Sequence, residues 1–199
     1  KDRSVLPGDP PLFFPETSME ALDMRLFGSG SVTSECELGA DQAIIVRDVE
    51  TREMIQQRIP TAIVLTIYEA KGSEFNDVLI YNFFSRSPAS SSQPWWALLN
   101  FSPDVPSSSN ALRSLPTPPS KSPTPAATRQ RIPDFVPNKH NRLCSELKHL
   151  YTAVTRARKR LWFFDDNPQL REPMMRIWLA QGAVTMTVDE ASLEQLATK

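Results

Sequence analysis

The sequence has little that would suggest a zinc site, a disulfide framework or a membrane span. Its 199 residues include two cysteines, Cys36 and Cys144, which are too few for either of the first two. No apolar run approaches the ~20 residues that a membrane-spanning helix needs, and the first residues lack the apolar stretch of a signal peptide. The formal net charge is −1, so any nucleic-acid-binding surface must be local. We expect an intracellular protein, with nucleus and cytoplasm left open.

The chain does not begin with methionine, and we expect it to be a piece of a longer protein. Its length and its 40% apolar content suit one domain with a buried core. Most of the 18 prolines fall in one part of the sequence, which is also rich in serine. We predict a lead-in at 1–40, a first part of the domain at 41–84, a disordered Ser/Pro-rich linker at 85–131, and the second part of the domain at 132–199.

An apolar stretch, WWALLNF at 95–101, interrupts this linker. Two interpretations of it remain open, since it can dock on the domain surface or serve as a recognition element for another protein. The SP and TP pairs around it are candidate phosphorylation sites, although Ser/Pro tracts are more often simple spacers. The sequence therefore leaves the role of the whole segment unassigned.

The most informative stretch predicts a strand, a loop and a second strand. The runs at 62–67 and 78–84 are apolar and alternate poorly, as strands buried on both faces of a sheet do. Open α/β domains bind ligands at the carboxyl edge of such sheets. The loop between the runs, residues 68–77, therefore supplies three candidate ligand contacts: Lys71, Gly72 and Glu74.

The remaining apolar patterns predict alternating strands and helices. Strands are expected at 12–14, 43–46, 161–164 and 184–188. Helices are expected at 18–27, 49–58, 145–158, 171–181 (from about Pro173) and 190–197. Such alternation indicates a three-layer α/β domain with a mostly parallel sheet.

Two of these helices have a predicted inner face. Asp48 is a candidate N-cap for the 49–58 helix, and Met54 and Ile55 are expected to face the core. The 145–158 helix is expected to bury one apolar face at helical spacing. The members of that face are Leu143, Leu147, Leu150, Tyr151 and Val154.

Two arginines stand where predicted elements end. Arg47 follows the 43–46 strand, and Arg156 lies in the last turn of the 145–158 helix. A guanidinium binds a phosphate through two parallel hydrogen bonds and keeps its charge, so arginines on two elements could clamp a transferring phosphoryl group. Taken singly, an arginine at a strand end is more often a solvated or ion-paired surface residue. Residues 139–160 also hold seven Lys or Arg against one Glu, a basic stripe suited to a nucleic-acid backbone.

Three motifs occur together and in a fixed order. AIIVRDVETREMI at 43–55, TIYEAKGSEF at 66–75 and ELKHLYTAVTRARKRLW at 146–162 resemble motifs IV, V and VI of the UvrD/Rep-type superfamily 1 helicases. The tyrosine at 68 and the run DVLIYNFF look closest to large TPR- and ankyrin-repeat-containing proteins with a helicase-like region. The resemblance implies the second RecA-like domain of an ATP-dependent helicase, of the P-loop NTPase fold type. ATP would then lie between this domain and a first RecA-like domain upstream.

The resemblance also implies roles for individual residues. Arg156 would be the arginine finger on the γ-phosphate, and Arg47 a second contact to that phosphate. The nucleotide would further lie against Gly72 and Glu74. Nucleotide state would be coupled to single-stranded nucleic acid, DNA in preference to RNA, through Thr66, Tyr68 and Lys71. The helix that presents the finger would be braced by Tyr151 and Thr155.

The sequence departs from the family pattern in several places. It contains no G-x-x-x-x-G-K-[ST], so the phosphate loop and the Mg²⁺ ligands would belong to the missing half, and we expect no ATP hydrolysis by this chain alone. Tyr68 replaces the usual histidine, and Ser73 the usual leucine. Motifs IV and V are too close together to hold the accessory domain of bacterial relatives. An alternative is therefore a degenerate helicase-like scaffold, without ATPase activity, in a large repeat protein.

Overall fold

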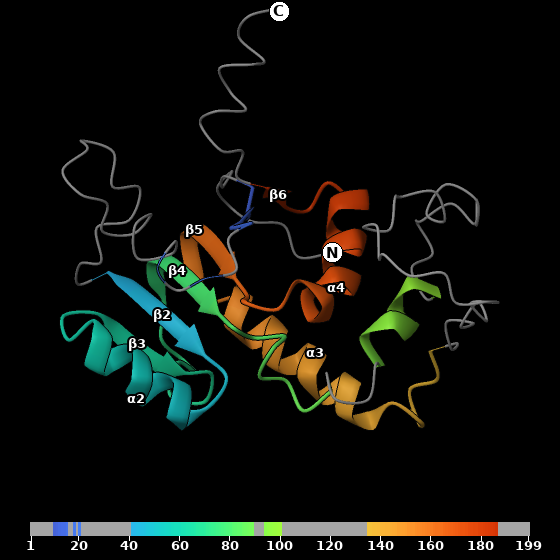
Figure 1. The fold of residues 1–199 in the computed structure, drawn as a ribbon, viewed down its shortest axis with the longest axis horizontal. Coiled ribbons are helices and arrows are strands. Elements are labelled where there is room, and N and C mark those ends of the chain that lie inside the picture. Colours follow the sequence, from blue (N-terminus) through green and yellow to red (C-terminus); the bar gives the residue numbers. More distant parts are fainter. Residues whose placement is uncertain are drawn as a thin grey trace, which may run out of the picture.

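The computed structural model describes residues 10–15, 18, 20, 41–89, 94–100 and 135–186 (Figure 1). Its strands are β1 (Leu12–Phe13), β2 (Gln42–Val46), β3 (Ile63–Thr66), β4 (Phe75–Tyr81), β5 (Ala157–Phe164) and β6 (Thr185–Met186). Its helices are α2 (Val49–Arg58), the 3₁₀ helix η2 (Pro94–Asn100), α3 (Asn141–Val154) and α4 (Pro168–Ala180). The helix expected at 190–197 and nearly all of the one expected at 18–27 lie outside the described residues. No described helix is long and apolar enough to cross a membrane.

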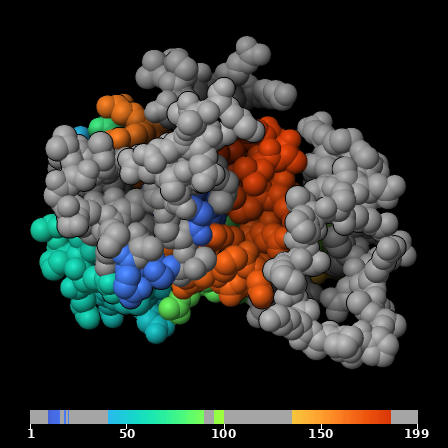
Figure 2. Space-filling model, turned by 45° about the horizontal axis from the view of Figure 1, so that its top comes forward, coloured from blue at the N-terminus to red at the C-terminus, as the bar shows by residue number. Residues whose placement is uncertain are grey.

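The strands form one sheet in the order β3-β2-β4-β5-β1-β6, and every neighbouring pair is parallel. Successive residues of each central strand point to opposite faces of the sheet. Ile45 belongs to the core on one face, together with residues of α3, α4 and η2. Ile44 and Val46 belong to the core on the other face, where Ile55 of α2 packs. The structure thus confirms the predicted three-layer α/β fold. Figure 2 shows α2 and β3 (teal) at one side of the molecule and the C-terminal elements (orange and red) across its middle.

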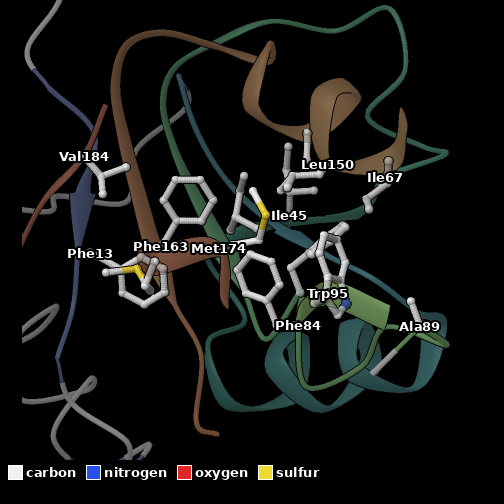
Figure 3. Close-up of a cluster of buried hydrophobic side chains, with 14 of the residues drawn as sticks. Phe13, Ile45, Ile67, Phe84, Ala89, Trp95, Leu150, Phe163, Met174 and Val184 are labelled. Atoms are coloured by element: carbon white, nitrogen blue, oxygen red, sulfur yellow. The ribbon is translucent and has the colours of Figure 1, made fainter. Parts of the chain in front are cut away.

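The apolar stretch in the predicted linker is part of the fold. It forms η2, whose Trp95 is 2% exposed and lies beside Phe84, with ring centroids 5.3 Å apart (Figure 3). Trp96 is less buried and lies under the guanidinium of Arg176 from α4, 5.5 Å from the ring centroid. Of the two interpretations, docking is the one that the structure shows. The described parts of segment 85–131 are 85–89 and 94–100, and their buried side chains are Ser87, Ala89, Trp95, Ala97 and Leu98.

Two expected core residues are exposed. Met54 is 43% exposed, and Thr51 shares the buried side of α2 with Ile55 instead, because its hydroxyl donates to Asp48 Oδ2 and needs no water. Tyr151 is also exposed, while Leu143, Leu150 and Ala153 carry the buried face of α3. In both helices the apolar spacing did not determine which residues face the core. A large apolar side chain at the edge of an apolar face can point toward the core or toward solvent.

Helix boundaries also differ from the predicted ones. α4 begins at Pro168 rather than near Pro173, because the side chain of Asn167 accepts the backbone N–H groups of Gln169 and Leu170, and proline is favoured in the first turn. α3 begins earlier than predicted and ends at Val154. Arg156 therefore stands just beyond the helix, directly before β5, rather than within the last helical turn.

Candidate functional site

The motif V segment is a helix-like turn that starts at Thr66, the last residue of β3. The backbone N–H of Glu69 donates to Thr66 Oγ1 (3.3 Å), and Glu69 Oε2 accepts the backbone N–H (2.8 Å) and hydroxyl (2.9 Å) of Thr66. This reciprocal pattern is a capping box. Arg52 of α2 donates to the other oxygen of Glu69. The pKa of Glu69 is lowered, chiefly by the backbone N–H and the hydroxyl of Thr66. Thr66 is thereby buried and its hydroxyl is engaged within the chain.

The far end of the same loop is open to solvent. Lys71, Gly72 and Glu74 are exposed, and Arg158 Nε lies 3.9 Å from Glu74 Oε2. Gly72 has φ +88°, and a Cβ added to it would meet nothing within 4 Å. Glycine is therefore favoured here by the backbone conformation and not by close packing around the Cβ position.

Arg156 is held against this loop. Its Nη1 donates to the Ser73 carbonyl (2.9 Å), its Nε to the Thr152 carbonyl (3.0 Å) and its Nη2 to Thr155 Oγ1 (3.1 Å). The Thr152 carbonyl belongs to the last turn of α3, so the guanidinium also suits the negative end of the helix dipole. Thr155 thus contacts Arg156 directly, whereas the ring of Tyr151 is exposed, and the backbone carbonyl of Tyr151 accepts a hydrogen bond from the Thr155 hydroxyl.

Arg47 is bound elsewhere, at the carboxyl edge of the sheet. Its Nε lies 3.0 Å from Glu146 Oε2, and its Nη2 lies 2.7 Å from Glu146 Oε1. The side chains are 14% and 3% exposed, so this is a largely buried pair with the fork geometry that guanidinium and carboxylate prefer. The hydrogen bond to Glu146 raises the pKa of Arg47. Burial alone would raise the pKa of Glu146, but hydrogen bonds from Arg47, His149 and Ser87 outweigh it and lower that pKa.

Tyr68 joins the same cluster from the motif V loop. Its hydroxyl lies 3.1 Å from Nε2 of His149, and His149 Nδ1 lies 3.0 Å from Glu146 Oε1. The two rings meet edge to face, with centroids 5.4 Å apart. Tyr68 remains 65% exposed, so its ring offers an aromatic surface of the kind on which unpaired bases stack.

The two arginines do not meet. Arg47 follows β2 at the carboxyl edge, whereas Arg156 precedes β5 at the amino edge of the sheet. Their contacts on α3, Glu146 and the Thr152 carbonyl, are separated by about 9 Å along the helix axis, given the rise per residue of an α-helix. The loop after Thr66 runs from one edge to the other, with Tyr68 at the first contact and Ser73 at the second. The structure therefore separates the candidate residues into a first group around Arg47 and Tyr68 and a second group around Arg156 and Ser73, joined by α3 and this loop.

Sequence reasoning missed three members of the first group: Glu146, His149 and Ser87. The Ser87 hydroxyl donates to Glu146 Oε2 (2.8 Å), and the residue lies in the segment that was predicted to be linker. Glu146 begins the motif VI stretch and is the one acidic residue of the basic segment 139–160, but neither observation indicates a partner for it. His149 gave no such signal, because a histidine three residues from a glutamate is common on helix surfaces.

A second carboxylate cluster lies at the carboxyl edge of β4 and β5. Asp165 is buried and accepts the backbone N–H groups of Phe84 (2.7 Å) and Ser85 (3.1 Å). Burial raises the pKa of Asp165 despite these hydrogen bonds. Asn82, at φ +50°, exchanges hydrogen bonds with Asp166. These contacts fix the turn after β5, and the described residues contain no group of three or more His, Cys, Asp or Glu suited to a metal ion.

Comparisons with known proteins identify the chain by family. The model of the UvrD-like helicase C-terminal domain matches residues 41–165, which include β2 through β5 and all three motifs. The chain is also 36% identical over 184 residues to the human protein named TPR and ankyrin repeat-containing protein 1. That alignment covers 92% of this chain and 6% of the human protein, so the chain spans a small part of that relative. The chain belongs to the family of UvrD-like helicase C-terminal domains.

Proposed function

We propose that this domain is the second RecA-like half of an ATP-dependent superfamily 1 helicase or translocase, active only together with a first half upstream. The observation that supports this best is the course of the motif V loop. One end of the loop binds Arg156 through the Ser73 carbonyl, and the other places exposed Tyr68 against His149. A continuous element between two contact regions is one means by which a domain can couple nucleotide state to a nucleic acid.

In this proposal the nucleotide lies on the Arg156 side of α3. Arg156 supplies a fixed positive charge for the γ-phosphate, and exposed Glu74 and Gly72 border the open space next to it. The phosphate loop, the Mg²⁺ ligands and the carboxylate that activates water are assigned to the first half. For Arg156 to act as a finger, its bonds to Ser73 and Thr152 must be exchanged for bonds to phosphate oxygens. These carbonyls are neutral acceptors, and a guanidinium bonds more strongly to an anion.

The proposed phosphate contact of Arg47 requires a rearrangement. Its charge is already compensated by Glu146, so a direct phosphate contact requires that a largely buried ion pair first open. Thr66 likewise must release Glu69 before its hydroxyl can reach a nucleic-acid phosphate. Tyr68 and Lys71, which are exposed, need no such rearrangement to meet single-stranded nucleic acid, with DNA preferred to RNA.

The test is the nucleic-acid-stimulated ATPase activity of the longer protein that includes the upstream half. We expect Arg156→Ala to abolish turnover while leaving ATP binding largely intact, because a finger acts on charge that develops in the transition state. Arg158→Ala is the matched control, since Arg158 is an exposed arginine two positions on with only a 3.9 Å contact to Glu74. Full turnover by the Arg156 variant would contradict the finger assignment.

A second candidate function is a helicase-like scaffold without ATPase activity. It is favoured by the hydrogen bonds of Arg47 and Arg156, which are made to other groups of this chain. It predicts that the longer protein binds nucleotide without turning it over, with or without oligonucleotide. Thymidine and uridine oligonucleotides of equal length, used side by side as stimulants, separate DNA from RNA dependence. Turnover stimulated by either one excludes the scaffold.

A further inference from the structure

The carboxylate of Glu146 is saturated with hydrogen bonds. Oε2 accepts from Arg47 Nε (3.0 Å) and Ser87 Oγ (2.8 Å), and Oε1 accepts from Arg47 Nη2 (2.7 Å) and His149 Nδ1 (3.0 Å). A carboxylate has about four lone-pair positions, and all of them are used here. At 3% exposure, no water can replace a lost donor without rearrangement. Glu146 therefore depends on these three residues for its hydrogen bonds and on Arg47 for its charge compensation.

The contacts determine which ring nitrogen of His149 carries the hydrogen in the neutral imidazole. An ionised carboxylate only accepts, so Nδ1 of His149 must carry a hydrogen and donate to Glu146. In the neutral imidazole the other nitrogen, Nε2, is then an acceptor, and the Tyr68 hydroxyl donates to it across 3.1 Å. This assignment follows from the network rather than from observed hydrogens. The result is a chain in which Tyr68 donates to His149, and His149 and Arg47 both donate to Glu146.

We propose that Glu146 and His149 form a proton-linked relay that reports the position of Arg47 to Tyr68. This inference rests on the proposed function, in the part where a phosphate contact by Arg47 requires its ion pair with Glu146 to open. When Arg47 leaves, Glu146 remains as a buried anion with only neutral donors, which is unfavourable. His149 then takes one proton from solvent on Nε2 and becomes the cation that replaces Arg47. No other bond forms or breaks, and the Tyr68 phenol keeps its own proton.

Protonation of His149 changes the exposed surface in two ways. Nε2 becomes a donor, so the Tyr68 hydroxyl can no longer donate to it and its proton is free to bond an external acceptor. The site also gains a positive charge beside an exposed aromatic ring. Both changes favour the phosphate and base of a single strand. Release of Arg47 from Glu146 therefore strengthens nucleic-acid binding at Tyr68, which is a coupling within the first group of residues.

The charged and titratable groups around His149 come from three elements. Glu146 contacts it from its own helix and Tyr68 from the motif V loop. Arg47, just after β2, contacts Glu146, and the negative charge of the adjacent Asp48 helps to raise the pKa of Arg47. Of these, the imidazole is the group that gains a proton most readily near neutral pH. The relay therefore predicts proton uptake at His149 and at no other member.

The experiment is an NMR titration of the two histidines in the full 199-residue chain. We expect Arg47→Gln to move the midpoint of the His149 titration to higher pH by about 1 or more, as an uncompensated neighbouring carboxylate does. His140 is the internal reference, because its ring lies on the backbone of Val136 instead. Arg160→Gln is the matched control, since it removes an arginine from an equivalent two-bond pair with buried Asp77 at the other edge of the sheet.

A second variant keeps the inference testable if Arg47→Gln does not fold. Glu146→Gln removes the anion, so the His149 midpoint must move to lower pH. An unchanged His149 midpoint in both variants, or an equal change in the Arg160→Gln control, would overturn the relay.

Oligonucleotide binding separates the relay from the proposed function. Fluorescence anisotropy with a labelled thymidine oligonucleotide should show about tenfold tighter binding at pH 6 than at pH 8 in the Arg47→Gln variant, where Glu146 has lost its cation, as expected for one charge-assisted hydrogen bond. Replacing Tyr68 by Phe should remove most of that pH dependence. If the His149 midpoint moves as expected while no variant binds the oligonucleotide at either pH, the relay stands and the nucleic-acid part of the proposed function fails.

Discussion

Arg47 and Glu146 are 99 residues apart in the sequence and form a two-bond ion pair, with nitrogen–oxygen distances of 3.0 and 2.7 Å. The pair joins the end of β2 to α3, and thereby joins motif IV to motif VI. The carboxylate is 3% exposed, so the pair is part of the interior rather than of the surface. Replacing one partner of a buried ion pair lowers stability, because the remaining charge stays buried with neither a counter-charge nor water.

That asymmetry gives a first prediction. Arg47→Gln should lower the free energy of unfolding by about 3 kcal/mol, because it leaves the Glu146 carboxylate buried and uncompensated. Adding Glu146→Gln should recover part of this loss, since the amide carries no charge to compensate. Urea unfolding of the two single variants and the double variant closes the cycle. Strictly additive losses would mean that the ion pair does not contribute as an interacting unit.

The carboxylates predict how stability depends on pH. Burial alone would raise the pKa of Asp77, but hydrogen bonds from Arg160 and Gln42 outweigh it and lower the pKa below its ordinary 3.8. Glu146 lies below its ordinary 4.5 for the same kind of reason. The unfolded chain therefore binds more protons in acid, so stability is complete above about pH 5 and is lost as pH falls through the lowered pKa values. Asp165, whose pKa burial raises, contributes in the opposite sense, losing stability as its carboxyl ionises.

Urea unfolding between pH 3 and pH 6 checks this. The original chain should gain free energy of unfolding as pH rises, and Glu146→Gln should gain less over the same interval. A variant that gains as much as the original chain would show that Glu146 titrates alike in both states.

Two adjacent tryptophans test the docking of η2. Trp95→Ala should cost about 3 to 5 kcal/mol, because the ring is 2% exposed and packs on Phe83 and Phe84. Trp96→Ala should cost about 1 kcal/mol or less, because its main contact is the cation–π interaction with Arg176. Unfolding followed by circular dichroism measures both variants. Equal, small losses of free energy of unfolding in the two variants would show that η2 does not pack on the core.

Gly72 offers a test of backbone conformation separated from packing. Its φ of +88° disfavours other residues, while a Cβ would contact nothing within 4 Å. Gly72→Ala should therefore cost about 1 to 2 kcal/mol through the backbone alone, and Gly72→Asn less, because asparagine tolerates positive φ better. The same comparison at Gly182, where φ is +62° and the Cβ position is also open, is the control. If alanine is tolerated at Gly72 and not at Gly182, the loop adopts another conformation in solution.

Much of the fold could be predicted locally. The strand at 43–46, the Asp48 cap and the helix to Arg58 were placed nearly to the residue, because an apolar run followed by a capping side chain depends only on near neighbours. The three-layer α/β fold followed from the alternation of these elements. The exposed sides of Met54 and Tyr151 could not be predicted, because which edge of an apolar stripe is covered depends on the element packed against it.

The candidate site also has one part that the sequence determines and another that depends on the tertiary structure. The sequence by itself determined that the chain carries motifs IV, V and VI in order, with Arg47, Tyr68 and Arg156 at the ends of elements. Only the tertiary structure decided that Arg47 is bound by Glu146, that Tyr68 reaches Glu146 through His149, and that Arg156 lies at the other edge of the sheet. These relations depend on strand order and on the path of α3 across the sheet. Residues about a hundred positions apart meet because of how layers stack, and no local pattern in either segment records the partner.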